Sequence, residues 1–393
     1  MKKVLIYKDV SQLAPKGGPA GYLYNLREGL HGIADPSLEI VFLDLGNAAA
    51  GKKRRTGIKF LDEIAGGFYH RRLYGNVMND AKPHVDGRTD FNQYDVVHFH
   101  SPYELYRVRD SLKDYCGKVL LTCHTPVPYY QEVISKFTKT DMRIMGSVAR
   151  NLSVIDKWAF ERADYLVFPC RYADESYLKL WPEYKNIRPL KEYKYILTGI
   201  KPCVAKIGKD EIRRKYGIPD DAFVFSYVGR HNEVKGYNDL KELASKVLEE
   251  NPNAWFLIAG KEEPLTRLNH DRWIEVGWTN DPHSIIAASD IFVLPNKETY
   301  FDLVLLEVLS LGVPVMATRT GGNKFFGDIE AVGVALYDNP DQGYNTALRF
   351  MNLDKKTLHD LGHENFLLYS NQFSLEQFTK NYIRLYQEVL QQT

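Results

Sequence analysis

The 393-residue chain has few cysteines, no long apolar run and almost no net charge. Its four cysteines form no CxxC pair and no zinc-ligand spacing, so neither a disulfide framework nor a metal site is expected. The apolar stretch from Leu303 to Met316 is too short to span a bilayer and is interrupted by Glu307. The opening residues, MKKVLIYKDV, hold an apolar run too short for a signal peptide. We therefore expect a soluble, cytoplasmic protein with reduced thiols.

Two common nucleotide-binding motifs are also missing. The expected strand Val4–Tyr7 is followed by a long loop with Gly17 and Gly18 rather than directly by GxGxxG, and no GxxxxGK[ST] occurs. Hydride transfer and P-loop ATPase activity are therefore poorly supported. A composition with 44% hydrophobic and 26% charged residues argues against a disordered, collagen-like or coiled-coil chain. The length corresponds to roughly two to three domains.

The small net charge conceals an asymmetry between the two halves of the chain. Residues 1–200 contain 30 Lys and Arg against 23 Asp and Glu, a balance of +7, and residues 201–393 contain 21 against 27, a balance of −6. This difference fits two domains with different surroundings, and it also fits ordinary variation of surface charge. Nucleic-acid binding is not indicated, because no long basic stripe or nucleic-acid motif accompanies the charge.

Short apolar runs alternate with helical patterns in both halves, which predicts parallel sheets covered by helices. The expected strands are 4–7, 39–44, 94–99, 118–123 and 164–168, then 223–228, 255–259, 274–276, 291–294 and 314–317. The expected helices include 21–30, 154–162, 237–250, 282–288, 303–311 and 375–390. Pro189–Gly208 is the candidate linker. We expect an α/β fold with domains 1–200 and 201–374 and a final helix at 375–393.

The segment GRHNEVKG (229–236) follows an expected strand and leads into a helix. Arg230 and Lys235 stand five residues apart in it. A planar guanidinium and a compact ammonium suit a diphosphate, so the segment is a candidate phosphate site. Spacing alone favours a solvent-exposed loop with incidental charges, and the second segment, described next, shifts the balance toward a phosphate site.

A second segment predicts an anion site at the start of a helix. The expected strand Ile291–Leu294 ends at Pro295, and the helix beginning at Leu303 has free backbone N–H groups at its first turn. Glu307 is the one charge in this apolar helix. A carboxylate there is expensive to bury without hydrogen bonds, so a hydroxyl-bearing ligand is a plausible partner. A hydrogen bond to neighbouring backbone or to a lysine is the structural alternative.

Together these segments resemble the family-4 retaining glycosyltransferases of the GT-B fold. The matching pieces are GGPAGYLYNL (17–26), DVVHFHSP (95–102), TCHTP (122–126), GRHNEVKG (229–236), EVGW (275–278) and ASDIFVLPNKETYFDLVLLEVLSLGVPVMATRTGG (288–322). The resemblance implies two Rossmann-like doubly wound domains that face each other across a cleft. It also implies that the C-terminal helix returns to the N-terminal domain.

The resemblance further implies a role for several residues. Arg230 and Lys235 would hold the donor diphosphate and stabilise the leaving group without a metal or other cofactor, the nucleotide sugar being a co-substrate. Glu307 would bind the ribose hydroxyls. His124 would contact the transferred sugar, although a strand-end structural histidine is the alternative. In the N-terminal glycine loop, Gly17 and Gly18 would allow close approach of the backbone to phosphate and acceptor.

The chain departs from the family pattern where the donor sugar is read. The family usually has Glu-x-Phe-Gly, with a first Glu eight positions before the second. Here Thr299 takes that position and Glu298 precedes it, and Asp302 replaces the usual glycine between Phe301 and Leu303. The Asp302 carboxylate could cap the helix, but it would also repel a diphosphate. The donor sugar is therefore left open, as are the acceptor, the linkage and the oligomeric state.

Two functions remain as hypotheses. The first is a retaining, metal-independent hexosyltransferase that uses a UDP-sugar or another nucleotide diphosphate sugar. Its acceptor would be a glycan, glycolipid or glycoprotein in bacterial surface polysaccharide biosynthesis. The second is a non-catalytic glycosyltransferase-like subunit that binds glycan or a partner transferase. The basic residues 52–55 and 179–195 further suggest peripheral binding to the anionic inner face of the cell membrane.

Overall fold

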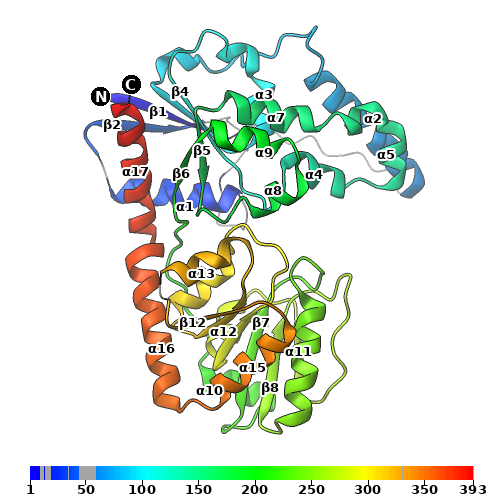
Figure 1. Cartoon of the computed structure of the whole chain (residues 1–393), viewed down its shortest axis with the longest axis vertical. Helices are drawn as coiled ribbons and strands as arrows, with labels where there is room; N and C mark the ends of the chain where they lie inside the picture. Colours follow the sequence, from blue (N-terminus) through cyan, green and yellow to red (C-terminus); the bar gives the residue numbers. More distant parts are fainter. Residues whose placement is uncertain (9–12, 14–18, 34, 44–58, 330, 393) are drawn as a thin grey trace. The chain divides into compact units, whose positions relative to one another are not determined.

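The computed structural model describes residues 1–8, 13, 19–33, 35–43, 59–329 and 331–392 (Figure 1). The chain forms two compact units. The N-terminal unit comprises Met1–Phe168, Asp174–Ile196 and Thr379–Thr393, and the C-terminal unit comprises Pro169–Ala173 and Leu197–Phe378.

The N-terminal unit is built on a six-stranded parallel sheet with the strand order β2-β1-β3-β4-β5-β6. Its strands are β1 (Lys2–Tyr7), β2 (Leu38–Phe42), β3 (Val96–Phe99), β4 (Lys118–Thr122), β5 (Tyr165–Phe168) and β6 (Glu192–Tyr195). Its helices are α1 (Pro19–Gly32), α2 (Lys59–Val77), α3 (Pro102–Arg107), α4 (Tyr129–Ser135), α5 (Lys139–Met145), α6 (Ser147–Arg150), α7 (Ser153–Arg162), α8 (Glu175–Leu180) and α9 (Tyr184–Ile187). The central strands are buried throughout, which is why they appear in the sequence as continuous apolar runs.

The C-terminal unit has a second six-stranded parallel sheet, with the order β12-β11-β10-β7-β8-β9. Its strands are β7 (Phe223–Val228), β8 (Ala254–Ala259), β9 (Trp273–Gly277), β10 (Ile291–Leu294), β11 (Val315–Thr318) and β12 (Val334–Tyr337). Its helices are α10 (Lys209–Lys215), α11 (Tyr237–Glu250), α12 (Pro282–Ala287), α13 (Leu303–Ser310), α14 (Phe325–Asp328), α15 (Pro340–Met351) and α16 (Lys355–Leu368).

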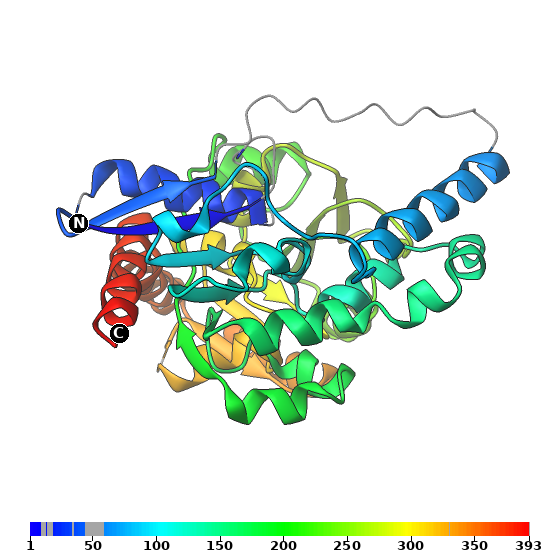
Figure 2. The same cartoon turned by 90° about the horizontal axis from the view of Figure 1, so that it is seen from above.

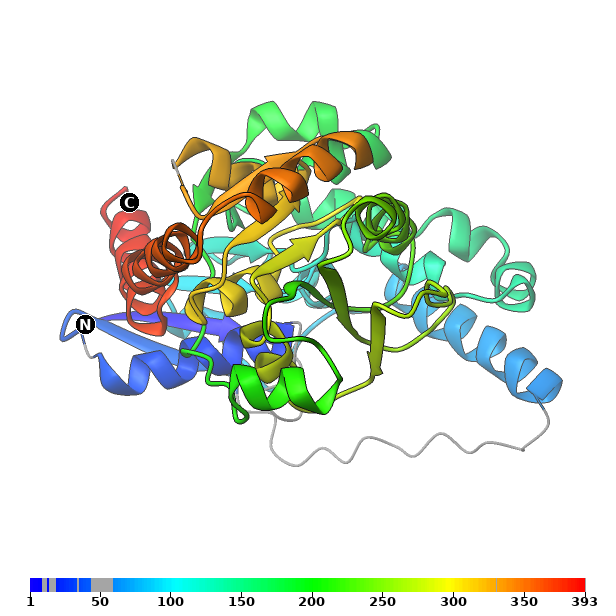
Figure 3. The ribbon, with the colours of Figure 1, turned by 90° about the horizontal axis from the view of Figure 1, so that it is seen from below.

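Helices cover both faces of the C-terminal sheet, as Figure 3 shows from below. Phe225 and Tyr227 of β7 point into a core with α11 and α15, whereas Val224 points into a core with α10 and α12. Because successive strand residues face opposite sides of a sheet, a strand covered on both faces is apolar at nearly every position. The buried Ser226 of β7 is the polar exception, and its hydroxyl donates a hydrogen bond to the Ser289 hydroxyl at 2.8 Å. The two parallel, helix-covered sheets confirm the predicted fold class.

The structure corrects the sequence prediction at the edges of the sheets. Strand β6 lies inside the predicted linker Pro189–Gly208, and β12 was not predicted. Both are edge strands with partly exposed residues. In β6, charged and aromatic residues alternate, which conceals the strand, whereas β12 has the apolar sequence VALY and the prediction overlooked it.

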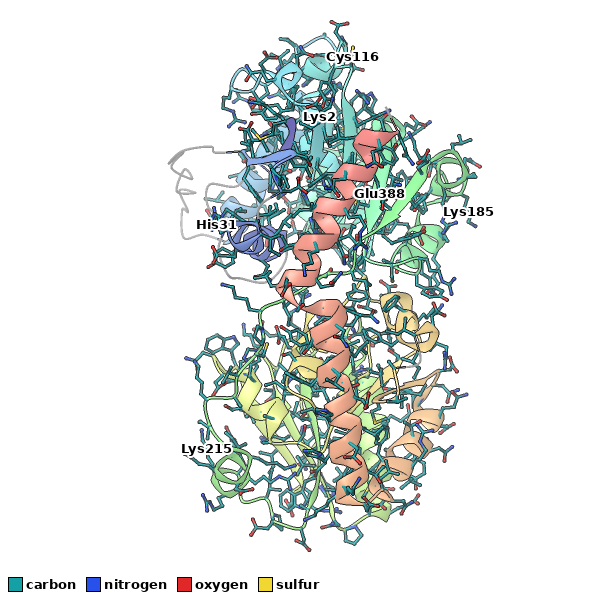
Figure 4. All side chains as sticks on the ribbon, turned by 90° about the vertical axis from the view of Figure 1, so that its left-hand side faces the viewer. Lys2, His31, Cys116, Lys185, Lys215 and Glu388 are labelled. Carbon is teal, nitrogen blue, oxygen red and sulfur yellow. The ribbon has the colours of Figure 1, made fainter. Side chains whose placement is uncertain are left out.

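The last helix, α17 (Leu375–Gln391), begins in the C-terminal unit and ends in the N-terminal unit. The Tyr382 hydroxyl lies 2.8 Å from the Tyr22 hydroxyl of α1. Near the end of α17, the carboxylate of Glu388, labelled in Figure 4, lies 3.6 Å from the Lys194 ammonium of β6. The predicted return of the C-terminal helix to the N-terminal domain is confirmed. Among the described residues, no helix combines the length and apolarity needed to cross a bilayer.

Candidate functional site

The loops 229–236 and 295–302, which hold most of the residues predicted to bind the donor, follow the carboxyl ends of β7 and β10. These two strands are neighbours in the sheet but not in sequence, so the order of strands reverses between them. Doubly wound sheets bind ligands at such a switch point. The topology therefore places the loops 229–236 and 295–302 where a ligand is expected.

The two loops are fastened to each other by backbone contacts. The Lys297 N–H donates to the Val234 carbonyl at 2.9 Å. Gly236 adopts a left-handed conformation with φ of 66°, and a Cβ at this position would lie 1.7 Å from the Pro295 carbonyl oxygen. Only glycine permits this approach without a shift of the backbone. The approach fixes Lys235, the residue before Gly236, beside the second loop.

Lys235 forms an ion pair with Asp302, the residue at the N-cap of α13. The same Asp302 oxygen accepts a hydrogen bond from the Asn296 amide at 2.7 Å. Burial alone would raise the pKa of Asp302, but the Lys235 charge and the two hydrogen bonds outweigh it and hold the pKa below its usual range. Asp302 makes no side-chain capping hydrogen bond to α13. The cation proposed for phosphate binding is thus neutralised by this chain's own carboxylate.

Arg230 is arranged differently from Lys235. Arg230 is exposed to solvent. Its backbone carbonyl accepts hydrogen bonds from the Tyr227 hydroxyl at 2.8 Å and from the Asn232 N–H at 3.0 Å. The backbone at Arg230 is therefore fixed while its guanidinium faces solvent. The structure places the two predicted cations in one loop, with Lys235 held and Arg230 exposed.

The segment between Pro295 and α13 packs against two glycines, Gly321 and Gly322, which lie close to the Thr299 carbonyl. The Gly322 N–H donates to the Thr299 carbonyl at 3.3 Å, and a Cβ on Gly321 would lie 2.0 Å from the same oxygen. Thr299 is buried and Glu298 is partly exposed. Of the two candidates for reading the sugar, only Glu298 offers a charged side chain with access to solvent.

The ring of Phe301 packs inside the C-terminal unit. It lies 6.0 Å from both Phe326 and Phe373 and 6.1 Å from Phe325, measured between ring centroids. Its side chain therefore fixes the start of α13, where Leu303 is the first, partly exposed residue. A contact of Phe301 with a donor would have to come from its backbone.

Glu307 lies one turn into α13, and its nearest charged partner is a histidine. Its Oε2 is 3.5 Å from Nε2 of His283 on α12, and the side chain is 29% exposed. Hydrogen bonding to Cys203 and to Glu307 raises the pKa of His283 to about 10. Since Glu307 keeps access to solvent, its carboxylate is available to the hydroxyl groups of a ligand.

A buried polar cluster supports the loop 229–236 from below. His231 stacks on Tyr237 with ring centroids 4.0 Å apart. The Glu275 carboxylate accepts hydrogen bonds from Trp273 Nε1 at 3.1 Å and from the Tyr237 hydroxyl at 3.2 Å. Burial raises the pKa of Glu275 to about 7. The EVGW and GRHNEVKG segments thus meet through side chains.

Replacing Glu275 by glutamine should flatten the pH dependence of stability. The folded chain binds the Glu275 proton more tightly than the unfolded chain between the ordinary pKa of 4.5 and about 7, so the free energy of unfolding falls as pH rises through this window. The loss is at most about 2–3 kcal/mol. Urea unfolding of both proteins at pH 5 and pH 8 measures it. An unchanged difference between the two pH values in E275Q would contradict this assignment.

His124 belongs to a cluster of three histidines in the N-terminal unit. His124 Nε2 lies 2.9 Å from Nδ1 of His100, and the rings of His98 and His100 stack with centroids 4.4 Å apart. Burial lowers the pKa of His98 and His124 to about 3 and that of His100 well below its ordinary value. All three rings are therefore neutral near pH 7, and neutral imidazoles both donate and accept hydrogen bonds.

A cavity of about 140 Å³ opens beside these histidines at the carboxyl ends of β1, β3 and β4. Its lining consists of Lys8, His100, Ser101, Pro102, Cys123, His124, Thr125, Tyr129, Glu132 and Tyr177. Lys8 forms an ion pair with Glu104 at 2.8 Å. Among the described residues, Nε2 of His100 is buried and has no hydrogen-bond partner.

The sequence prediction missed most of this lining. His98 and His100 stand two apart at the end of a strand, and residues two apart face the same side, so HFHSP did contain a signal for His100. Lys8 and Glu104 are distant in sequence and gave no signal. The predicted Gly17 and Gly18 lie outside the described residues, as do the basic residues 52–55.

The fold has relatives of known structure that cover nearly the whole chain. Sucrose-phosphate synthase from Thermosynechococcus elongatus covers all of both chains with a TM-score of 0.62 at 16% identity. Anabaena HepE, solved in complex with UDP and glucose, has a TM-score of 0.59 at 14% identity and covers 99% of this chain and 100% of its own. These similarities identify the GT-B fold and confirm that prediction.

Sequence comparison relates the C-terminal part of the chain to a known family. Residues 208–389 match the family model of the group 1 glycosyl transferases. An Escherichia coli enzyme named UDP-Gal:alpha-D-GlcNAc-diphosphoundecaprenol alpha-1,3-galactosyltransferase is 30% identical over 38% of this chain and 42% of its own length. The lipopolysaccharide core biosynthesis glycosyltransferase LpsE of Rhizobium meliloti is 29% identical over 44% of this chain and 52% of its own.

The chain thus spans about half the length of the curated relatives that it matches. Residues 208–389 match the group 1 glycosyl transferase family, the family that the sequence motifs predicted.

Proposed function

We propose that this protein is a retaining glycosyltransferase that transfers a hexose or N-acetylhexosamine from a nucleotide diphosphate sugar, with UDP-sugars as the first candidates. The acceptor is a glycan, lipid-linked sugar or glycoprotein of bacterial surface glycan synthesis. The relatives' names support this class: one curated relative uses UDP-Gal and a diphosphoundecaprenol-linked acceptor, and HepE was solved with UDP-glucose.

The observation that carries the proposal is the position of Lys235. A tightly constrained backbone turn holds its ammonium at the carboxyl end of β7, beside the start of α13. Free N–H groups at a helix start and a fixed cation together favour a diphosphate. In the proposal Arg230 closes on the diphosphate from solvent, and Glu307 receives the ribose hydroxyls. Glu298 or Thr299 reads the sugar.

The N-terminal cavity supports the acceptor half of the proposal. Neutral imidazoles and tyrosines suit the uncharged hydroxyls and apolar faces of a sugar ring better than they suit an ion. The unpartnered Nε2 of His100 offers a position for one such hydroxyl. His124 would contact the transferred sugar, as the family resemblance implies.

The proposed chemistry is a front-face substitution that retains the anomeric configuration. The bond between the sugar C1 and the diphosphate oxygen breaks while the acceptor oxygen bonds to C1 from the same face. The acceptor proton passes to the departing phosphate oxygen. Lys235 and Arg230 stabilise the negative charge that develops on the leaving diphosphate, which is electrostatic preorganisation without a protein nucleophile.

A cytoplasmic location at the inner face of the membrane is part of the proposal. Nucleotide sugars and lipid-linked acceptors meet there, and the excess of basic residues in the N-terminal half favours an anionic surface. Binding of the basic segment 179–195 to this surface stays a prediction from the sequence.

A panel of nucleotide sugars assayed for slow hydrolysis of the donor tests the proposed activity without knowledge of the acceptor. We expect one UDP-sugar to be hydrolysed faster than the others, with release of UDP and of a sugar that keeps its anomeric configuration when first formed. Hydrolysis of none of the donors, together with no binding of UDP or GDP, would contradict the proposal.

Two observations favour the second candidate, a non-catalytic subunit that binds glycan or a partner transferase. Asp302 neutralises Lys235, and Thr299 replaces the family's first glutamate. The two candidates differ in nucleotide binding: a subunit without a donor would bind glycan and leave UDP unbound.

A further inference from the structure

The outer face of α2 exposes an unusual number of large apolar side chains. The exposed fractions are 63% for Phe60, 45% for Leu61, 59% for Phe68 and 55% for Tyr69. At 3.6 residues per turn, these four side chains occupy one broad face of the helix. Such a patch on a helix surface marks an interaction site more often than a scatter of single apolar residues does.

The inner face of α2 is firmly packed, so the outer face cannot turn inward. A Cβ on Gly67 would lie 2.8 Å from the Ile144 side chain of α5, which shows how closely the two helices approach. Tyr74 is buried in a cluster with Met145, and Arg71 donates to the Ile144 carbonyl at 3.1 Å. Figure 2 shows α2 and α5 side by side, extending away from the sheet of the N-terminal unit.

The most accessible charges around this patch are basic. On α2, α5 and α6, every charged residue that the structure describes as exposed is basic: Arg71, Arg72, Lys139, Arg143 and Arg150. The acidic residues of these helices are less accessible. Asp62 and Glu63 are partly exposed, and Asp141 is buried beneath His70 at 3.5 Å. Exposed aromatic rings flanked by arginines are typical of helices that lie in the interface of an anionic bilayer.

The basic stretch 179–195 also exposes Leu190 and Tyr195, at 81% and 46%, but several of its cations are held by other groups of the chain. Lys179 pairs with Glu175 at 2.8 Å, Arg188 pairs with Asp174 at 2.7 Å, and Lys191 donates to the Ala163 carbonyl at 2.8 Å. Cations already held by this chain's own acceptors contribute less to binding an external anion.

We propose that the outer face of α2 docks on an anionic lipid bilayer, with Phe60, Leu61 and Phe68 entering the boundary between headgroups and acyl chains. Arg72 and Arg143 contact lipid phosphates. The inference rests on the proposed function in one respect, since a lipid-linked acceptor requires the protein to work at a membrane. It adds apolar insertion by a defined helix to the electrostatic attraction.

Flotation of the full-length protein with vesicles tests the proposal. We expect the protein to float with vesicles of equal parts phosphatidylcholine and phosphatidylglycerol, and F60S/F68S to lower the partition coefficient by about tenfold or more. R72Q/R143Q should lower it by about tenfold to thirtyfold at low salt. The control V85S/V154S removes two exposed apolar side chains of the same unit, 60% and 46% exposed, and should float like the parent.

Three results would overturn the proposal. The first is flotation of F60S/F68S equal to that of the parent, and the second is no flotation of the parent. The third is a concentration-dependent dimer that F60S/F68S dissociates in the absence of vesicles, which would make a second copy of the chain the occupant of this face. UDP binding, measured on the same variants without vesicles, reports separately on the proposed function, because α2 and the donor loops belong to different units.

Discussion

Replacing Lys235 by alanine should reduce turnover of the donor by about 100-fold to 1,000-fold, the range observed when one preorganised charge-stabilising donor is removed. The change removes the ammonium that faces the start of α13 and also leaves the Asp302 carboxylate without its counterion. Both effects oppose a diphosphate. The measurements are the rate of donor hydrolysis and the dissociation constant of UDP.

A matched control is available on the same unit. Lys246 of α11 pairs with Asp341 of α15 at 2.6 Å, away from the loops 229–236 and 295–302. Lys246→Ala also breaks a lysine–aspartate pair, and we expect it to keep the parent's rate and UDP affinity. Equal effects of the two substitutions would show that Lys235 acts through stability alone.

Replacing Asp302 by asparagine should have the opposite effect on UDP, tightening its binding by about tenfold. A carboxylate about 5 Å from a phosphate charge costs up to about 3 kcal/mol at an effective dielectric constant of 20, and partial exposure reduces this to about 1–2 kcal/mol. Asparagine keeps the shape while it removes the charge and releases Lys235. Calorimetric titration with UDP measures the change, and Asp341→Asn is the charge-matched control.

The double variant K235A/D302N separates two roles of Asp302, as the counterion of Lys235 and as a negative charge that repels the diphosphate. If Asp302 acts mainly as the counterion of Lys235, the double variant should bind UDP more tightly than K235A does, because no unpaired carboxylate remains. The coupling of two residues in direct contact is measured by such a cycle. Weaker UDP binding in D302N than in the parent would contradict the assigned role of Asp302.

The sequence predicted the centre of the fold better than its edges. Buried strands such as Ile291–Leu294 are apolar at every position. This pattern can be recognised in the sequence without knowing which elements pack against the strand. The edge strand Glu192–Tyr195 alternates charged and aromatic residues, which is equally typical of a loop. Helix α2 was missed because Phe60 and Phe68 on its exposed face obscure the expected alternation of apolar and polar faces.

The candidate site was only partly predictable for a related reason. The GRHNEVKG segment made Arg230 and Lys235 visible, because both belong to one local pattern. The pairing of Lys235 with Asp302 depends on how closely the Pro295 carbonyl approaches Gly236, and no local pattern encodes that distance. The same holds for Glu307 and His283, which come from different helices.

Titration of the wild-type protein with UDP in a calorimeter tests the central claim most directly, namely that the loops after β7 and β10 form a nucleoside diphosphate site. The account predicts saturable binding of one UDP per chain that weakens at least tenfold in K235A. An absence of binding by UDP and GDP, or an affinity unchanged in K235A, would contradict it.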